Sequence, residues 1–305
     1  MILERMLAYC DDVDFGFINS CKWVKLAVAR FRRDLDRQND DDFAFVFDEE
    51  KANRAVKFCQ MFPHIKGPLA SQKLMFEPWQ LFIVGNLFGW VRKETGYRRF
   101  RQAYTEVARG NGKTAMTAPI GLYGLTADGE GGAEIYTAAS GREQATLLWG
   151  TAKEMTRKCP EFMKKFGVEP MAHRIIQDES SSYFRAVASD AAAIDGFNVH
   201  MALVDELHAH KTRDVYDALE TGLGKRPQSM IWSITTAGTN LSGICYEVHS
   251  YVKQVLEQVH EDDAFFGIIY TLDEGDDWTD EKNWVKSNPN WEVSVEPNML
   301  KSLCQ

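Results

Sequence analysis

The sequence predicts an α/β fold in which a mainly parallel central sheet is flanked by helices. Short apolar runs typical of buried strands alternate with amphipathic runs typical of helices. A segment ending in Gly-Lys-Thr, residues 107–114, follows one such strand and opens one such helix. A second apolar strand, residues 201–206, ends in two adjacent carboxylates. Phosphate-binding loops occur at strand-to-helix junctions of this kind, so the sheet is expected to carry a nucleotide site.

Composition limits the class of protein. The chain has 305 residues and a net charge of −9. This charge argues against a protein that binds nucleic acid over its whole surface, but it is compatible with a local basic surface. The six cysteines show no C-x-x-C spacing, so we expect reduced thiols and no zinc finger. The sequence has no secretory signal and no apolar run near the ~20 residues that cross a bilayer. These features predict an intracellular protein that does not enter the membrane.

The chain is expected to divide into three parts. Residues 1–70 form an N-terminal helical extension, with helices predicted over 16–35 and 48–62. Residues 71–242 form the core, and residues 243–305 form a small lid or linker segment with a helix over 244–260 and a strand over 265–272. A basic cluster precedes the phosphate-loop strand and is either a solvated turn, which we favour, or a contact for a nucleic-acid backbone. Its members are Arg92, Lys93, Arg98, Arg99 and Arg101.

The phosphate loop begins where the strand over residues 101–107 ends and the helix over 115–125 starts. Lys113 is expected to bring a charge to the β- and γ-phosphates, and Gly112 lets the backbone approach them. The hydroxyl of Thr114 suits Mg²⁺. Val107 stands where the standard motif has its first glycine. A Gly-Lys-Thr in an unrelated surface turn is the alternative. The predicted nucleotide-binding residues of the loop are Arg109, Gly110, Asn111, Gly112, Lys113 and Thr114.

The acidic pair supplies the other half of a hydrolytic site. Asp205 is expected to hold Mg²⁺ through water, and Glu206 to orient and deprotonate the water that attacks the γ-phosphate. His208 and His210 follow directly and are interpreted as ordinary loop histidines, because no second group of metal ligands accompanies them.

Four further residues are candidates for the same site. Gln80, ahead of an apolar helix over 81–91, could read an adenine base or could be a simple helix-surface residue. Thr235 and Thr236 end the strand predicted over 229–235 and could contact the γ-phosphate or the catalytic water. Arg142 follows the strand over 133–139 and could sense a phosphate or reach the nucleotide of a neighbouring subunit, although a solvent-facing arginine is equally compatible.

Together these segments resemble one family, the large terminase subunit of tailed bacteriophages, which packages viral DNA. The resemblance rests on Arg109–Thr114, on Leu203–His208 and on Thr235–Gly238, together with Phe76–Gln80 and Tyr270–Asp273. Members carry a deviant phosphate loop with an arginine four residues before the lysine and no obligatory first glycine. Arg109 and Val107 match that pattern.

The resemblance implies a P-loop ATPase of the additional-strand type that uses ATP and Mg²⁺ to move double-stranded DNA into a procapsid. It also implies a homo-oligomeric ring, the portal protein and the small terminase subunit as partners, and the cytoplasm of the infected bacterium as location. Arg109 would contact the γ-phosphate, Gln80 would read adenine, Thr235 and Thr236 would couple hydrolysis to movement, and Arg142 or Arg226 would be the arginine finger. A nuclease domain is expected beyond residue 305, so this chain alone should not cut DNA. The alternatives are a helicase-like DNA-dependent ATPase and a nucleotide-gated assembly protein without turnover.

Overall fold

The computed structural model describes residues 1–67, 69–188 and 196–304, without the side chains of residues 142, 143, 188 and 303. In this part of the chain one central sheet has eight strands, and a separate hairpin is formed by β1 (Phe45–Phe47) and β2 (Trp90–Arg92). In sheet order the eight strands are β10 (Phe265–Ile269), β3 (Gln102–Glu106), β9 (Met230–Thr235), β8 (Val199–Asp205), β4 (Glu134–Ala139), β7 (Ser182–Ala188), β6 (Arg174–Gln177) and β5 (Val168–Pro170).

The predicted mainly parallel sheet is confirmed. Strands β10, β3, β9, β8, β4 and β7 all run parallel, and β6 runs antiparallel to both of its neighbours, β7 and β5. Strand β9 lies between β3, which leads into the phosphate loop, and β8, which ends in the acidic pair. This is the additional-strand arrangement. Strand β10 pairs with β3, so the sheet continues past residue 242, where the sequence places the end of the core.

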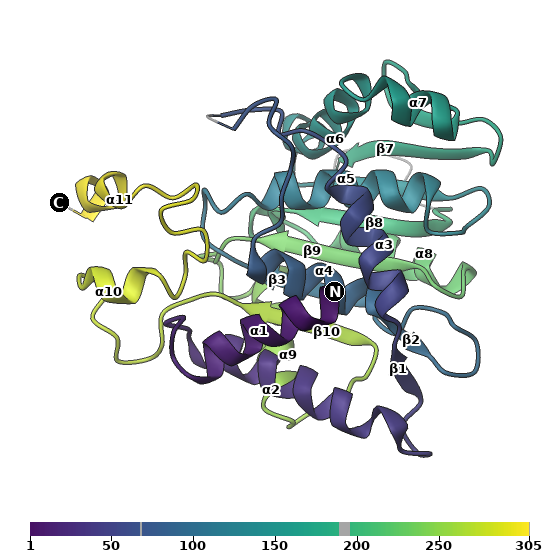
Figure 1. Ribbon diagram of the computed structural model, residues 1–305. Coiled ribbons are helices and arrows are strands. Elements are labelled where there is room, and N and C mark those ends of the chain that lie inside the picture. The colour runs from purple at the N-terminus through teal and green to yellow at the C-terminus, as the bar shows by residue number, and fades with distance from the viewer. Residues whose placement is uncertain (68, 189–195, 305) are drawn as a thin grey trace.

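Helices cover both faces of the sheet (Figure 1). On one face, α5 (Lys113–Thr126) brings Gly121 against Phe184 of β7, so closely that a Cβ at Gly121 would lie 2.6 Å from that ring. On the other face, Val252 of α9 (Ile244–Leu256) packs against Gly267 of β10. Because both faces are covered, β8 and β9 are buried at every residue, as expected for a parallel sheet. The remaining helices of at least seven residues are α1 (Ile2–Asp14), α2 (Lys22–Asp36), α3 (Glu49–Cys59), α4 (Pro78–Gly89), α6 (Arg142–Arg157), α7 (Pro160–Phe166), α8 (Asp214–Gly222) and α11 (Pro297–Cys304).

The N-terminal helices share the hydrophobic core with the sheet. Tyr9 of α1 contacts Phe82 of α4 with ring centroids 5.3 Å apart, and its hydroxyl lies 3.2 Å from that of Tyr270. Helix α1 has no counterpart among the predicted elements, and the helix predicted from residue 16 begins only at Lys22. The residues before it form a turn instead, in which Cys21 donates a hydrogen bond to the carbonyl oxygen of Ile269. Within the described residues no helix is long and apolar enough to cross a membrane.

Both interpretations of the basic cluster are wrong for three of its five members. Arg99 is 2% exposed, and its guanidinium contacts Asp34 at 2.7 Å and Asp263 at 2.6 Å. Arg98 is also buried and pairs with Asp128 at 2.6 Å, while Arg101 donates to four backbone carbonyl groups. These side chains connect segments that are distant in sequence. They are therefore not solvent-facing side chains of a turn.

Arg99→Ala should lower the free energy of unfolding by about 3–5 kcal/mol, because it leaves a buried carboxylate without its main partner. Chemical denaturation followed by circular dichroism measures this loss. Arg92→Ala is the matched control, since the exposed side chain of Arg92 stacks over Phe45, and it should cost less than about 1 kcal/mol. Equal effects of the two substitutions would contradict the structural role assigned to Arg99.

Candidate active site

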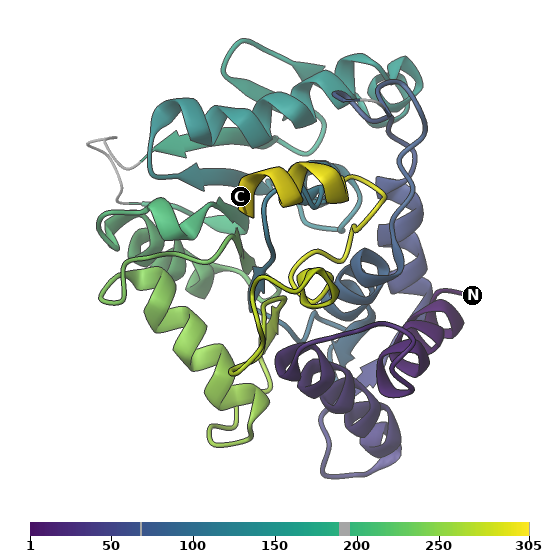
Figure 2. The ribbon, with the colours of Figure 1, turned by 90° about the vertical axis from the view of Figure 1, so that its left-hand side faces the viewer.

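The candidate site lies at the edge of the sheet where the parallel strands end. Glu106 at the end of β3 is in register with Thr235 at the end of β9, and Asp205 at the end of β8 is in register with Ile234. Residues distant in sequence therefore meet at one edge. Figure 2 looks onto this side of the molecule, with the C-terminal segment lying across it in yellow.

The phosphate loop has the backbone geometry that its glycines allow. Gly110 and Gly112 adopt positive φ angles of 84° and 72°, and Gly112 is the N-cap of α5. Positive φ is readily accessible only to glycine, so both positions require it. Val107 is fully buried, and its backbone N–H donates to the carbonyl oxygen of Thr235 at 3.0 Å. Val107 thus continues the buried strand β3 by one residue. This explains why a side chain fits at the position where the standard motif has its first glycine.

Lys113 and Glu206 face each other across the loop. The Lys113 Nζ atom lies 3.8 Å from Glu206 Oε1, and it donates to the carbonyl oxygens of Val107 at 3.2 Å and Ala108 at 3.4 Å. Burial lowers the pKa of Lys113, and the nearby Glu206 opposes that shift. A buried ammonium group held by two neutral carbonyl oxygens and one carboxylate is well suited to exchange them for a more negative ligand.

Two carboxylates occupy the end of β8. Asp205 is 8% exposed, and burial, together with the neighbouring Glu206, raises its pKa to about 6. Glu206 has a positive φ of 50°, which is uncommon for a residue with a side chain, and its N–H donates to Ile234 on β9. Carboxylate and hydroxyl oxygens, such as those of Asp205 and of the half-buried Thr114, are ligands that Mg²⁺ prefers. The described residues contain no group of three or more His, Cys, Asp or Glu side chains that could hold a metal without further ligands.

The predicted strand end at Thr235 and Thr236 lies beside Glu206. The backbone N–H of Thr236 is 3.4 Å from Glu206 Oε2, and its hydroxyl is 3.5 Å from the same atom. Thr235 is fully buried and donates to the carbonyl oxygen of Thr236. The end of β9 therefore contacts the carboxylate of the neighbouring strand directly.

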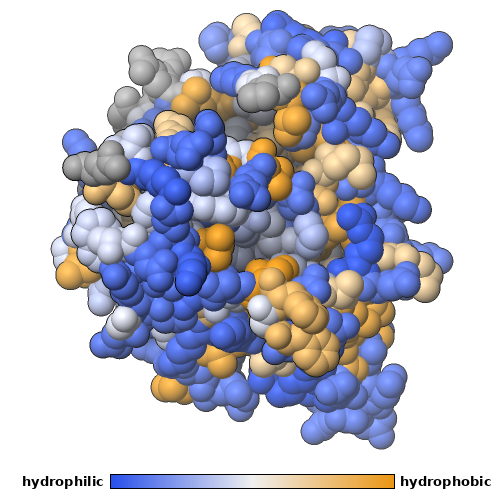
Figure 3. Space-filling view, turned by 60° about the vertical axis from the view of Figure 1, so that its left-hand side comes forward, coloured by the Kyte–Doolittle hydropathy of each residue, from blue (hydrophilic) through white to orange (hydrophobic). Residues whose placement is uncertain are grey.

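Gln80 is buried and does not lie on a helix surface. Its Oε1 atom accepts a hydrogen bond from the backbone of Glu77 in the N-terminal turn of α4, and its amide nitrogen lies 3.6 Å from the position of a Cβ built at Gly112. Gln80 lines a cavity of about 610 Å³ that also includes Gly112 and Ala115 of the phosphate loop and its helix. The far wall comes from the loop before α4 and from residues 290 and 292–297. Figure 3 shows this side of the molecule, where the surface is hollowed between hydrophilic and hydrophobic residues.

The side chain of Asn111 holds the C-terminal segment. Its amide nitrogen donates to Asn288 Oδ1 at 3.0 Å, and its oxygen accepts from the backbone of Asn290 at 2.9 Å. Trp79 adds a 2.6 Å hydrogen bond to Asn290 Oδ1. We call Asn111, Asn288 and Asn290 the asparagine clasp. The sequence analysis did not identify Asn288 or Asn290, because nothing local in Asn-Pro-Asn indicates a partner about 180 residues away.

The three arginine candidates lie in different surroundings. Arg109 is exposed in the phosphate loop, and its positive charge adds to the effect of burial in lowering the pKa of Lys113. Arg142 is the first residue of α6, and its side chain lies outside the described part of the structure. Arg226 bonds Glu130 at 2.7 Å and the backbones of Gly131, Gly132 and Asn198, which precede β4 and β8. It therefore sits at the opposite edge of the sheet in an intramolecular cluster, which argues against Arg226 as an arginine finger.

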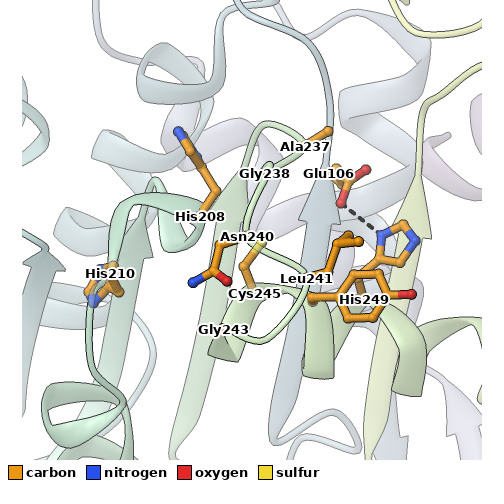
Figure 4. Close-up of a pocket in the computed structure, with 11 residues that line it drawn as sticks. Glu106, His208, His210, Ala237, Gly238, Asn240, Leu241, Gly243, Cys245 and His249 are labelled. Carbon is orange, nitrogen blue, oxygen red and sulfur yellow. Dashed lines mark hydrogen bonds and ion pairs between the residues drawn. The ribbon is translucent and has the colours of Figure 1, made fainter.

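A second, smaller pocket of about 130 Å³ lies beside the ends of β3 and β9. Figure 4 shows Glu106 joined to His249 in its wall, where Glu106 Oε2 lies 2.9 Å from His249 Nδ1. The hydroxyl of Tyr104 donates to the same oxygen at 2.6 Å. This carboxylate was not identified from the sequence, and its partners place it in a structural network behind the phosphate loop.

Comparison with known proteins gives a consistent result. Residues 78–254 match the family model described as terminase large subunit, ATPase domain. The large terminase subunit of Enterobacteria phage HK97 is 21% identical over 247 residues, covering 78% of this chain and 46% of that protein. The crystal structure of the HK97 large terminase superimposes with a TM-score of 0.70 over 83% of this chain and 50% of that chain, at 19% identity.

A shorter match has a higher sequence identity. Protein YmfN of Escherichia coli K12 is 48% identical over 108 residues, which is 35% of this chain and 24% of YmfN. The chain thus spans less than half the length of these two curated relatives. The family model covers more than half of the chain, and it includes the phosphate loop, the acidic pair and the end of β9. This chain therefore belongs to the family of terminase large subunit ATPase domains.

Proposed function

We propose that this chain hydrolyses ATP and is the motor portion of a phage large terminase. The observation that carries the proposal is the approach of Lys113 to Glu206, at 3.8 Å, from strands separated by β9. A buried cation that can bind phosphate and a carboxylate that can activate water are the two groups that γ-phosphate hydrolysis needs. Membership of the terminase ATPase family supports the same conclusion.

Each residue of the site has a separate task in this proposal. Lys113 binds the β- and γ-phosphates, together with the N–H groups at the start of α5. Arg109, exposed on the loop, reaches the γ-phosphate. Glu206 accepts a proton from the water that attacks the γ-phosphate. Thr114 directly, and Asp205 through water, would hold Mg²⁺, which would neutralise negative charge on the phosphates.

The adenine base fits the cavity beside Gln80. That cavity opens from Gly112 and has room for a nucleoside, and the amide of Gln80 points toward the loop. An amide that both donates and accepts can read an adenine edge, although the helix already uses the Gln80 oxygen. We therefore assign base recognition to the Gln80 nitrogen.

At the level of the whole motor, we propose that the chain moves double-stranded DNA into a procapsid in the cytoplasm of an infected bacterium. It would act as a homo-oligomeric ring with the portal protein and the small terminase subunit. Arg142 is the remaining candidate for the finger that reaches a neighbouring subunit's nucleotide, since Arg226 is held by Glu130. A finger in trans accelerates such reactions by about 10³–10⁵-fold, so the isolated chain should hydrolyse ATP slowly.

We also propose that residues 281–304 act as a lid over the phosphate loop. Ser294 donates to Gly110 at 2.6 Å, and the asparagine clasp holds the same segment at Asn111. Residues of the lid also form one wall of the base cavity. Nucleotide binding and the position of the lid are therefore expected to depend on each other.

Glu206→Gln should lower the rate of ATP hydrolysis by about 10²–10⁴-fold, because the amide cannot accept the proton of the attacking water. Affinity for a fluorescent ATP analogue should change little. Phosphate release under single-turnover conditions measures the rate, with the exposed Glu154→Gln as control. Comparable hydrolysis by the wild type and Glu206→Gln would remove the mechanism and favour a nucleotide-gated protein without turnover.

Thr236→Val should slow turnover by roughly tenfold while leaving ATP affinity within about threefold, because it removes only a hydroxyl near Glu206. Nucleotide titration and single-turnover hydrolysis separate the two effects. Thr221→Val, on the exposed surface of α8, is the control. Loss of nucleotide binding in Thr236→Val would show that this threonine serves the binding site and not the coupling step.

Asn111→Ala should release the lid, because it removes both side-chain hydrogen bonds that Asn111 makes to Asn288 and Asn290. Amide hydrogen exchange of peptides covering residues 285–297 should become faster by at least about tenfold, which corresponds to the loss of about 1.4 kcal/mol. Asn39→Ala, at an exposed position, is the control. Unchanged exchange in Asn111→Ala would mean that other contacts hold the lid.

A further inference from the structure

The imidazole ring of His208 lies among three oxygen atoms at the candidate active site. Its Nδ1 atom is 3.2 Å from Glu206 Oε2, 3.0 Å from Thr235 Oγ1 and 3.2 Å from Thr236 Oγ1. The ring is about one-fifth exposed and points away from the Glu106 and His249 pair of the neighbouring pocket (Figure 4). The sequence alone predicts an ordinary loop histidine, but this position touches both strand ends that carry the reaction.

The neighbouring groups determine which atom carries the hydrogen. Thr235 donates its hydroxyl hydrogen to the carbonyl oxygen of Thr236 at 2.8 Å and accepts one from the backbone N–H of His208 at 3.1 Å. A carboxylate can only accept. Thr235 is therefore an acceptor toward the ring, so Nδ1 of His208 carries the hydrogen and donates it to Thr235 Oγ1 at 3.0 Å, with the Glu206 carboxylate 3.2 Å from the same nitrogen.

The residues that follow β9 leave space for His208. A Cβ at Gly238 would lie 2.9 Å from the Cβ atom of His208, closer than such atoms approach in folded proteins. Gly238 has no positive φ that would require glycine. The glycine of the Thr-Thr-Ala-Gly segment is therefore explained by the space that His208 needs.

Glu206 depends on such support because its own backbone is strained. A glutamate at a φ of 50° lies in the left-handed region, which costs about 1–2 kcal/mol relative to ordinary backbone. Its N–H is fixed to Ile234 of β9, so the side chain leaves the strand end in a set direction. The last bonds of the side chain are then oriented by His208 and Thr236 on one carboxylate oxygen and by Lys113 on the other.

We propose that His208 is a positioning residue for ATP hydrolysis. Its Nδ1–H donates to Thr235 and lies 3.2 Å from Glu206 Oε2, so the ring links the Glu206 carboxylate to the end of β9 and limits the orientations that the carboxylate can adopt. His208 does not touch the nucleotide in this arrangement and acts only through Glu206. The inference rests on the proposed ATPase activity.

The test compares His208→Ala with His208→Asn, whose side-chain amide can donate from nearly the position of Nδ1. Displacement of a catalytic group by about 1 Å can cost about 10²-fold, so His208→Ala should slow single-turnover ATP hydrolysis by about 10–100-fold. Affinity for a fluorescent ATP analogue should stay within about threefold of wild type, since only the hydrolytic step is affected. His208→Asn should restore most of the rate. His210→Ala is the matched control from the same loop, because no contact to Glu206 is found for His210 among the described residues, and its rate should be close to wild type.

The outcomes separate this inference from the proposed function. Hydrolysis at the wild-type rate by His208→Ala overturns the positioning role, and so does a His208→Asn variant as slow as His208→Ala. An equal loss of nucleotide affinity and rate points to a merely structural role and also overturns it. If His208→Ala does not fold, His208→Leu, which has similar bulk and no donor, replaces it in the comparison with His208→Asn. A wild-type chain that does not hydrolyse ATP overturns the proposed function, and the inference with it.

Discussion

The structure depends on one electrostatic arrangement, a buried lysine and two adjacent carboxylates, one buried and one partly exposed, at the same edge of a parallel sheet. Lys113 follows β3 and Glu206 follows β8, two strands that are two positions apart, and neighbouring strands are spaced by about 4.8 Å. The intervening strand β9 therefore sets the gap between them and supplies the threonines that line it. Charged groups that are removed from water are costly unless they have partners. The site is held in this state by Lys113, by the end of β9 and by His208, all of which a nucleotide could rearrange.

The parts that sequence reasoning predicted are those with a local signal. The segment of residues 107–114 was placed correctly between a strand and a helix, because an apolar run, two glycines and a helical pattern follow one another within a short stretch. The acidic pair was placed because an apolar strand buried on both faces ends at Asp205. Parallel strands end at a common edge, so the meeting of Lys113 with Glu206 follows from the fold once both elements are assigned.

The parts that sequence reasoning missed depend on distant partners. Arg99 looks like a solvated cation until Asp34 and Asp263 are brought to it, and the partners that hold the Asn111 side chain, Asn288 and Asn290, lie about 180 residues away in the sequence. His208 gains its importance from Thr235, 27 residues away, and from the absence of a side chain at Gly238. In each case the residue type was visible in the sequence, while its role depended on a contact that only the folded chain creates.

A structure of the chain with Mg²⁺ and a non-hydrolysable ATP analogue tests the central claim most directly. The account predicts that Lys113 Nζ leaves the carbonyl oxygens of Val107 and Ala108 and binds β- and γ-phosphate oxygens. It also predicts that the γ-phosphate lies between Lys113 and Glu206, with a water within hydrogen-bonding distance of the Glu206 carboxylate. Nucleotide bound elsewhere on the sheet, or bound at the loop while Lys113 keeps its present partners, would contradict it.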